Sequence, residues 1–284
     1  MIRQVRLTIL AENTVWGGTL LAEHGLSLLI EADGHAVLFD TGQGQVLLGN
    51  ARQLGVKLAQ VQAVVLSHGH YDHTGGLARI LTLAARPAIY LHPVALEKKY
   101  ARLDDPPHRS IGIPAAAAEC IRAHAGRVVW TREPAEVCPG ICATGEVPRN
   151  TDFEDTGGAF FLDESCSRPD PLVDDQALYI ESVVGLIVVL GCAHAGVVNT
   201  LDHIAGLTGR RDVHAVVGGM HLARASKQRI QKTLQALERF QVRVIGPCHC
   251  TGSAAVARLR SRFGSRVVDC ITGSRLQFGV TDPR

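Results

Sequence analysis

A buried strand that ends in a run of metal-ligating side chains is the feature that most constrains this chain. The largely apolar run from Val61 to Leu66 has strand length and ends abruptly in polar residues. Three imidazoles and one carboxylate follow within the next few positions, at His68, His70, Asp72 and His73. Neutral imidazole and carboxylate groups bind zinc, iron and manganese. A polar loop that is rich in histidine by chance is a poor explanation for so many ligand-type residues in so short a stretch. The sequence therefore predicts a metal site where a strand ends.

The remaining pattern predicts how the chain is organised around that site. The first half is rich in strands and contains a hairpin signal at Asp33-Gly34, whereas the second half alternates strands and helices. This order favours two sheets packed face to face with helices outside. Nine of the twelve prolines lie between positions 93 and 175. We therefore predict one domain over residues 1–284, in which the segment at about 93–175 forms a lid-like cover over one edge of the site.

The composition of the chain narrows the classes of molecule that it is expected to bind. The chain has 29 Lys and Arg against 27 Asp and Glu, so its net charge of +2 gives no electrostatic reason to expect nucleic acid or a membrane surface. The uncharged stretch from Ser182 to Leu201 is interrupted by glycines and a histidine, which favours a buried strand over a membrane span. The eight cysteines show no disulfide spacing. We expect a cytoplasmic protein with a small-molecule substrate and leave its oligomeric state open.

The histidine-rich run resembles the signature of a known family. His68-x-His70-x-Asp72-His73, after an apolar strand and before a Thr-Gly-Gly turn, is similar to the metallo-β-lactamase-fold superfamily. Asp40, in a Phe-Asp-Thr-Gly string, matches an upstream aspartate that supports the site by hydrogen bonding in that superfamily. The resemblance covers nearly the whole chain. It implies an α/β fold, a four-layer αβ/βα sandwich of two mixed β-sheets flanked by helices, with the site at the sheet edge between the two halves.

Three later strings narrow the resemblance to one branch. They are Gly191-Cys192-Ala193-His194-Ala195-Gly196, Gly218-Gly219-Met220-His221-Leu222 and Pro247-Cys248-His249-Cys250-Thr251-Gly252, with Asp174-Asp175-Gln176 before them. They resemble the dihydropterin–ribofuranosylaminobenzene-phosphate synthase-like branch, also described as dihydropteroate-synthase-like. A branch name of this kind describes one proposed activity and does not fix the substrate of each member.

The resemblance also implies a set of ligands. His68 and His70, with His194, would hold one divalent ion, while Asp72, His73 and His249 would hold a second. Zinc is the first expectation for one or two such ions, with iron or manganese as alternatives.

The position of the superfamily's bridging aspartate is less regular here. No such aspartate is apparent, and either Cys192 or His221 can stand in its place. His221 is equally a candidate for a ligand, a hydrogen-bond donor to a ligand or a proton carrier, and Cys192 for a soft ligand or an inert buried thiol. We list Asp72 and His221 as catalytic candidates. The remaining histidines lack comparable context: His24, His35, His92, His108, His124, His203 and His214.

Three functions remain open at this stage. The first is a metal-dependent hydrolase that uses a metal-activated water on an ester, phosphodiester or related small-molecule bond. The second is a pterin-pathway synthase that joins a dihydropterin to a ribofuranosylaminobenzene phosphate, which 13 aromatic residues in 284 weakly disfavour. The third is a metal-binding or redox protein without hydrolytic turnover. Further acid–base candidates lie in loops, at Glu146, Glu154 and Asp175.

Overall fold

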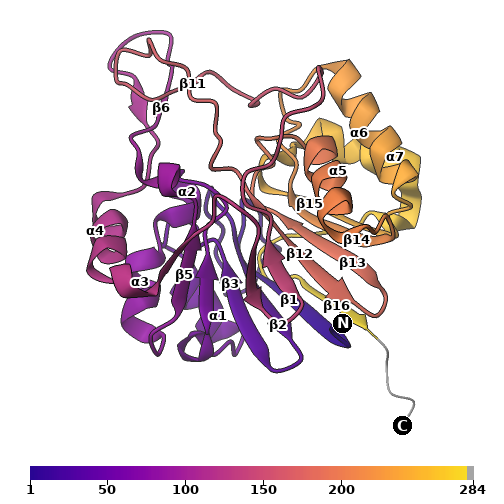
Figure 1. Cartoon of the computed structure of the whole chain (residues 1–284), viewed down its shortest axis with the longest axis horizontal. Coiled ribbons are helices and arrows are strands. Elements are labelled where there is room, and N and C mark those ends of the chain that lie inside the picture. Colours follow the sequence, from indigo (N-terminus) through magenta and orange to yellow (C-terminus); the bar gives the residue numbers. More distant parts are fainter. Residues whose placement is uncertain (280–284) are drawn as a thin grey trace.

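The computed structural model describes residues 1–279, and two mixed β-sheets form its centre (Figure 1). The first sheet has seven strands. In spatial order they are β16 (Arg275–Gly279), β1 (Gln4–Ala11), β2 (Ser27–Ala32), β3 (His35–Phe39), β4 (Ala63–Val65), β5 (Ala88–Leu91) and β8 (Val128–Trp130). Strands β3, β4, β5 and β8 are parallel to one another, whereas β16, β1 and β2 join the sheet through antiparallel pairs. The predicted hairpin joins β2 and β3, because Asp33 and Gly34 both adopt the positive φ that a tight type I′ turn needs.

The second sheet has six strands. They are β15 (Val244–Cys248), β14 (Val213–Gly219), β13 (Gly185–Leu190), β12 (Ala177–Ser182), β10 (Ile141–Ala143) and β9 (Ala135–Cys138). Strands β13, β14 and β15 are parallel, so their carboxyl ends share one edge of the sheet. Every residue of β13 is buried, as expected of a strand covered on both faces.

Apolar side chains fill the space between the sheets and cover their outer faces. The central cluster takes Leu7, Ile30 and Phe39 from the first sheet, and Ile180 and Val189 from the second. The helices α1 (Leu47–Gln53), α3 (Leu77–Leu83) and α4 (Ala115–Ala123) lie outside the first sheet, while α5 (Val197–Thr208), α6 (Lys227–Arg239) and α7 (Ser253–Phe263) lie outside the second (Figure 1). The predicted four-layer αβ/βα sandwich is therefore confirmed.

The segment at 93–175 does not form one continuous cover. Its middle part supplies α4 and β8 to the first half of the fold, and β9 and β10 to the second sheet. The two flanking parts pair with one another as a small separate sheet, which consists of β11 (Phe160–Phe161), β6 (Tyr100–Ala101) and β7 (Arg109–Ser110). This small sheet stands beyond the ends of the main strands (Figure 1). We call residues 150–172, which include β11, the cover.

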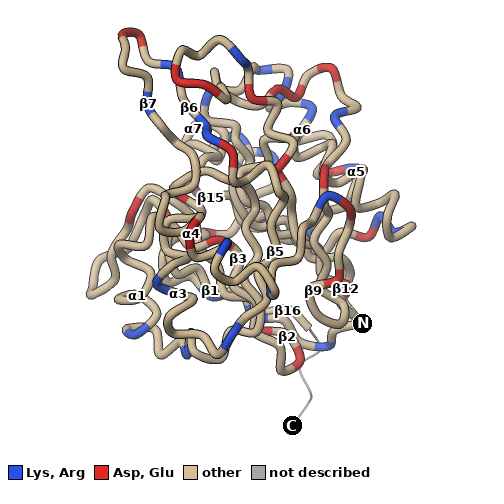
Figure 2. The backbone as a smooth tube through the Cα atoms, turned by 60° about the vertical axis from the view of Figure 1, so that its left-hand side comes forward, with Lys and Arg blue, Asp and Glu red and all other residues tan. Residues whose placement is uncertain are grey.

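Charged residues of both signs are interspersed over the outer loops and helices (Figure 2). None of the helices within residues 1–279 combines the length and the apolar character that crossing a bilayer requires.

Candidate metal centre

The loop after β4 brings the first group of predicted ligands together. His68 lies three residues after the end of the strand at Val65, and the one-turn helix α2 (Tyr71–Thr74) carries Asp72 and His73. The side chains of His68, His70, Asp72 and His73 are all buried, although they are polar. Burying four such groups costs free energy unless they are paired or bind a cation.

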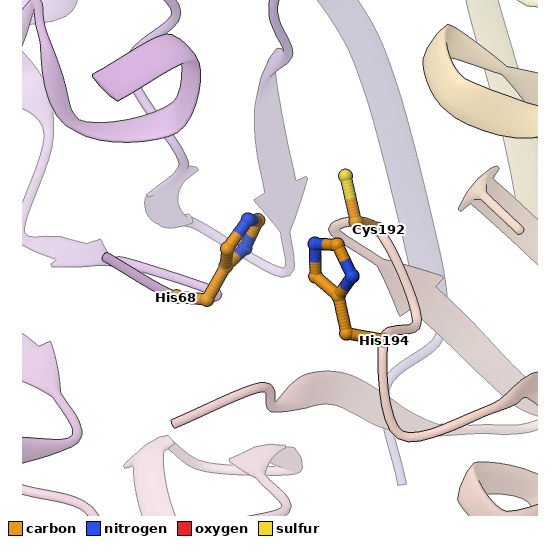
Figure 3. Close-up of side chains that lie close together, drawn as sticks. All are labelled: His68, Cys192 and His194. Atoms are coloured by element: carbon orange, nitrogen blue, oxygen red, sulfur yellow. The ribbon is translucent and has the colours of Figure 1, made fainter. Parts of the chain in front are cut away.

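The second group comes from the shared edge of β13, β14 and β15. Cys192 and His194 follow β13, His221 follows β14, and His249 follows β15. The two groups face one another across the gap between the halves of the fold. Figure 3 shows the imidazole of His68 opposite that of His194, with Cys192 beside them.

One set of ligand atoms lies on the side of His68. His68 Nε2 is 2.9 Å from His70 Nδ1, and the rings of both lie about 5 Å from that of His194, at centroid distances of 4.8 and 5.1 Å. The ligand atoms of His68, Cys192 and His194 lie within 4.8 Å of one another. His70 Nε2 and His194 Nε2 are buried without a hydrogen-bond partner among residues 1–279.

The other set lies on the side of His73. His73 Nε2 is 3.2 Å from His249 Nε2 and 3.2 Å from Cys192 Sγ. Asp72 Oδ2 lies 3.5 Å from His249 Nε2 and 3.8 Å from His73 Nε2. Nitrogen, sulfur and carboxylate atoms thus converge where a cation would satisfy their lone pairs.

Hydrogen bonds on the outer side of four rings fix which nitrogen faces inward. In each ring Nδ1 contacts an oxygen, so Nδ1 carries a proton and Nε2 points into the centre, where a neutral ring presents its lone pair. The four pairs are His68 with Ser67 Oγ (2.9 Å), His73 with Asp40 Oδ2 (2.7 Å), His194 with the carbonyl of Thr156 (2.7 Å) and His249 with Asn13 Oδ1 (2.8 Å). The arrangement fits a divalent metal, because metal-bound histidines usually have such outer partners.

Electrostatics keep most of these imidazoles neutral near pH 7. Burial lowers the pKa of His70 to about 3 and that of His249 to about 4. Burial likewise holds the pKa values of His68 and His194 well below the ordinary 6.5. Neutral rings keep the lone pair that a metal ion needs.

His73 and Asp72 differ from the other groups. Burial alone would lower the pKa of His73, but the carboxylates of Asp40 and Asp72 outweigh it and raise that pKa to about 9. Burial would raise the pKa of Asp72, yet the neighbouring His73, His24 and His249 hold it well below its usual value. Asp72 therefore carries a negative charge that attracts a cation, and a metal ion must displace a proton from His73.

A sequence profile described as "Metallo-beta-lactamase superfamily" matches residues 21–203. The chain belongs to the metallo-β-lactamase superfamily.

Two individual proteins are similar over almost the whole chain. A 7,8-dihydropterin-6-methyl-4-(beta-D-ribofuranosyl)-aminobenzene-5'-phosphate synthase from Methanocaldococcus jannaschii is 32% identical, and the match covers 92% of each chain. The solved structure of Tm1679, described as a metal-dependent hydrolase of the beta-lactamase superfamily, is 31% identical with a TM-score of 0.81, and the match covers 97% of this chain and 100% of that one. A metallo-beta-lactamase fold protein from Bacillus subtilis, at 11% identity and a TM-score of 0.58, shares the fold over 97% of this chain and 100% of its own.

His221 occupies a different position from the histidines that were predicted as metal ligands. Its ring lies 4.4 Å from that of His194, and its Nε2 contacts the carbonyl of Gly157 at 3.2 Å. Its ligand atom lies within 4.8 Å of the thiols of Cys192 and Cys250. His221 thus stands beside the set on the His68 side, and its catalytic role stays a prediction.

Sequence reasoning missed His24. Its exposed ring places Nε2 3.1 Å from Asp72 Oδ2, and it forms a ligand-type group with Asp72 and His249. It lies in an irregular segment between β1 and β2 with no motif around it. Only in the folded chain does His24 lie close to Asp72, and that contact alone relates His24 to the site.

The three loop carboxylates predicted as acid–base candidates have structural partners. Glu146 pairs with His92 at 2.8 Å and with Arg132 at 3.4 Å. Glu154 accepts hydrogen bonds from two backbone N–H groups in the first turn of α5. Asp175 accepts one from the N–H of Ala195, next to His194. Each carboxylate therefore has polar partners of its own, and an acid–base role for it stays a prediction.

The cover closes the His68 side of the site. The carbonyls of Thr156 and Gly157 accept the hydrogen bonds of His194 and His221, and the ring of Phe160 lies 5.2 Å from that of His70. Buried Arg229 of α6 holds this segment through a 2.7 Å contact with Asp155. The exposed ring of His24 lies on the other side, next to Asp72.

The close approach of the two halves requires a glycine at position 191. A Cβ atom on Gly191 would lie 2.2 Å from Ser67 Oγ, well inside any contact distance. Ser67 Oγ in turn donates to Asp40 Oδ2 at 2.7 Å, so the end of β13 packs directly on the groups that orient His68 and His73.

Changing Asp40 to asparagine is expected to weaken metal binding about 10- to 100-fold, since outer partners of metal ligands contribute effects of that size. Buried Asp40 accepts from His73 Nδ1 and Ser67 Oγ through Oδ2 and from the N–H of Ser67 through Oδ1, and an amide nitrogen in place of either oxygen accepts no hydrogen bond. Zinc titration against a competing chelator measures the change. Asp104→Asn, at an exposed loop position, is the matched control. Unchanged affinity in Asp40→Asn would show that Asp40 does not orient a ligand.

Asp175 is expected to make the stability of the metal-depleted protein depend on pH. Burial raises its pKa from 3.8 to about 6, so the folded chain holds this proton more tightly than the unfolded chain. The resulting stability is complete below about pH 4 and is lost as the pH rises through about 6, by roughly 3 kcal/mol in total. Urea unfolding of wild type and Asp175→Asn between pH 4 and 8 tests this. The difference between the two curves should follow that window, and parallel curves would contradict it.

Proposed function

We propose that this protein is a metal-dependent enzyme that acts on an ester, phosphodiester or related bond of a small molecule. The observation that carries the proposal is the convergence of inward-facing imidazole nitrogens, the Asp72 carboxylate and the Cys192 thiol at one buried place. Outer hydrogen bonds orient four of the rings, as at metal sites.

The geometry supports two adjacent ion positions. His68, His70 and His194 would hold one ion, and Asp72, His73 and His249 the other. Zinc suits this mixture of nitrogen, sulfur and oxygen, and iron also accepts it, whereas manganese favours sites richer in oxygen. When bound, such a dication polarises a substrate oxygen and acidifies a coordinated water.

The chain's own residues would supply orientation and proton transfer. As the alternative to binding the second ion, the Asp72 carboxylate, with Oδ2 at 3.1 Å from His24 Nε2 and 3.5 Å from His249 Nε2, can align an attacking group and accept its proton. The exposed His24 ring can pass that proton to solvent, because its Nε2 contacts Asp72 directly. The cover would keep bulk water from the other side of the site.

A transfer reaction is the second candidate, and the similarity to the Methanocaldococcus jannaschii synthase favours it. In hydrolysis water would attack the scissile carbonyl or phosphoryl centre, whereas in the transfer the nitrogen of an arylamine would attack a carbon of the pterin and displace its phosphate leaving group. The ring of Phe160, near His70 and His194, offers an aromatic face to a flat substrate, although aromatic residues are few in the chain.

A metal-binding or redox protein without turnover is the third candidate, and the thiol of Cys192 beside the imidazoles favours it. We also propose a reducing compartment such as the cytoplasm, because all eight cysteines carry free thiols.

One experiment compares the three candidates. Protein purified without added metal is analysed for metal content, reloaded, and assayed with a phosphodiester, a lactone and a thioester in ¹⁸O-labelled water. A parallel assay supplies an aminobenzene ribofuranosyl phosphate with a dihydropterin whose 6-methyl carbon carries a phosphate leaving group. The hydrolase is expected to place ¹⁸O in its product, and the transferase to form a C–N bond only when the amine is present. A fully loaded protein without turnover in either assay would contradict the enzymatic proposal.

A further inference from the structure

Cys192 occupies a central position that the ligand sets above do not use. It follows β13 and is only 3% exposed. Its Sγ belongs to one ligand-type group with His68 and His194, and to a second with His73 and His249. The thiol therefore lies between the two ion positions.

The thiol of Cys192 leaves one of these neighbours without a partner. Its closest ring atom is His73 Nε2 at 3.2 Å, and its single hydrogen can serve only one acceptor. His194 Nε2, on the other side, remains buried without a hydrogen-bond partner in the described part of the chain. The outer hydrogen bond of His194 directs this Nε2 lone pair inward, where a cation or a hydrogen-bond donor would satisfy it.

We propose that the Cys192 thiolate is a ligand shared by both ion positions. The proposal rests on the metal-binding part of the function proposed above, and not on turnover. Deprotonation releases one proton to solvent when the ions bind, and the sulfur then has lone pairs for both. The thiolate adds a second anion to that of Asp72 in a site whose other ligands are neutral, which favours two dications over one. A soft sulfur also selects zinc, cobalt or iron over magnesium or manganese.

Cys250 provides the matched control. Its Sγ forms a ligand-type group with Cys192 and His221, and it contacts the carbonyl of Cys192 at 3.7 Å. It belongs to neither of the two groups that contain His68 or His73. Cys250 is thus a thiol in the same pocket that does not lie between the ion positions.

Cobalt(II) titration of the full-length, metal-depleted protein tests the proposal, since a cobalt-bound thiolate gives near-ultraviolet charge-transfer absorption. The wild-type band is expected to grow with the first equivalent of cobalt and to change again with the second. Cys250→Ser should keep both steps. Cys192→Ser should lose the band and bind each equivalent at least about tenfold more weakly. Cys192→Asp should also lack the band but recover binding of two ions, because it restores an anionic ligand.

Three results would overturn the proposal: two bound cobalt ions in wild type without the band, a band complete at one equivalent, or a band that survives in Cys192→Ser. If Cys192→Ser does not fold, the cobalt titrations of wild type and Cys250→Ser still test the proposal, because either can lack the band or complete it at one equivalent. The outcome is separate from that of the proposed function. A wild-type protein that shows both cobalt-binding steps but no turnover would contradict the proposed enzymatic function and not the shared ligand. Turnover with two bound ions and no charge-transfer band would contradict the shared ligand and not the enzymatic function.

Discussion

His70→Ala is expected to lower turnover by about a thousandfold or more and to reduce the metal content, while the fold is retained. Several kcal/mol of charge stabilisation depend on a correctly held ion, and each 1.4 kcal/mol corresponds to about a factor of ten in rate. His70 Nδ1 lies 2.9 Å from His68 Nε2, so its removal opens the ion position on that side. Steady-state rates and elemental analysis measure the two losses.

The fold should survive this change because the site lies at the edges of two sheets that have apolar cores of their own. Circular dichroism of His70→Ala should therefore resemble that of wild type. His35→Ala, at a histidine on β3 that contacts only Gln62 among the polar side chains of residues 1–279, is the control and should keep both activity and metal. Complete unfolding of the wild-type protein on metal removal would instead identify a structural metal.

Lys99→Met is expected to lower the free energy of unfolding by about 3–5 kcal/mol, because it leaves buried carboxylates without a counter-charge. Lys99 is fully buried, and its Nζ lies 2.8 Å from Asp170 and 2.9 Å from Asp174. Asp174 also accepts a hydrogen bond from the N–H of Gly69, between two predicted ligands. The change should therefore weaken metal binding as well as stability.

Urea unfolding measures the effect of Lys99→Met on stability. Lys98→Met, at the exposed neighbouring lysine, should change the free energy of unfolding by no more than about 0.5 kcal/mol. Adding Asp170→Asn to Lys99→Met should recover part of the loss, since it removes one of the two unpaired charges. A stability of Lys99→Met within 1 kcal/mol of wild type would show that this ion-pair group contributes little.

Short sequence patterns predicted those parts of the fold that depend on interactions between residues close together in the chain. The hairpin at Asp33-Gly34 and the strand before His68 each follow from a short pattern, and both are present. Ser226, a residue type that favours N-caps, caps α6, with its Oγ accepting from the N–H of Arg229 at 3.1 Å. The run of ligands after β4 was equally local, because one short stretch of sequence, residues 68–73, carries all of them.

Pairings between distant segments could not be predicted in the same way. Strand β16 returns to pair with β1 across nearly the whole chain, and β9 and β10 join the second sheet from a proline-rich region that lacks a clear period. Their positions depend on sheet edges formed elsewhere. His24 was missed for the same reason, since only the folded chain brings it to Asp72. Cys192 was recognised as a candidate, but its place between two histidine pairs became visible only in three dimensions.

The cover touches the site mainly through its main chain. The carbonyls of Thr156 and Gly157, rather than side chains, receive the hydrogen bonds of His194 and His221. Most side chains of the cover can therefore change during evolution without disturbing these contacts. Gly157 is an exception, since a Cβ atom there would lie 1.9 Å from the ring of His221. Mutations in the cover can alter which molecules enter while the ligand set persists, which gives a superfamily member a direct evolutionary route from one substrate to another.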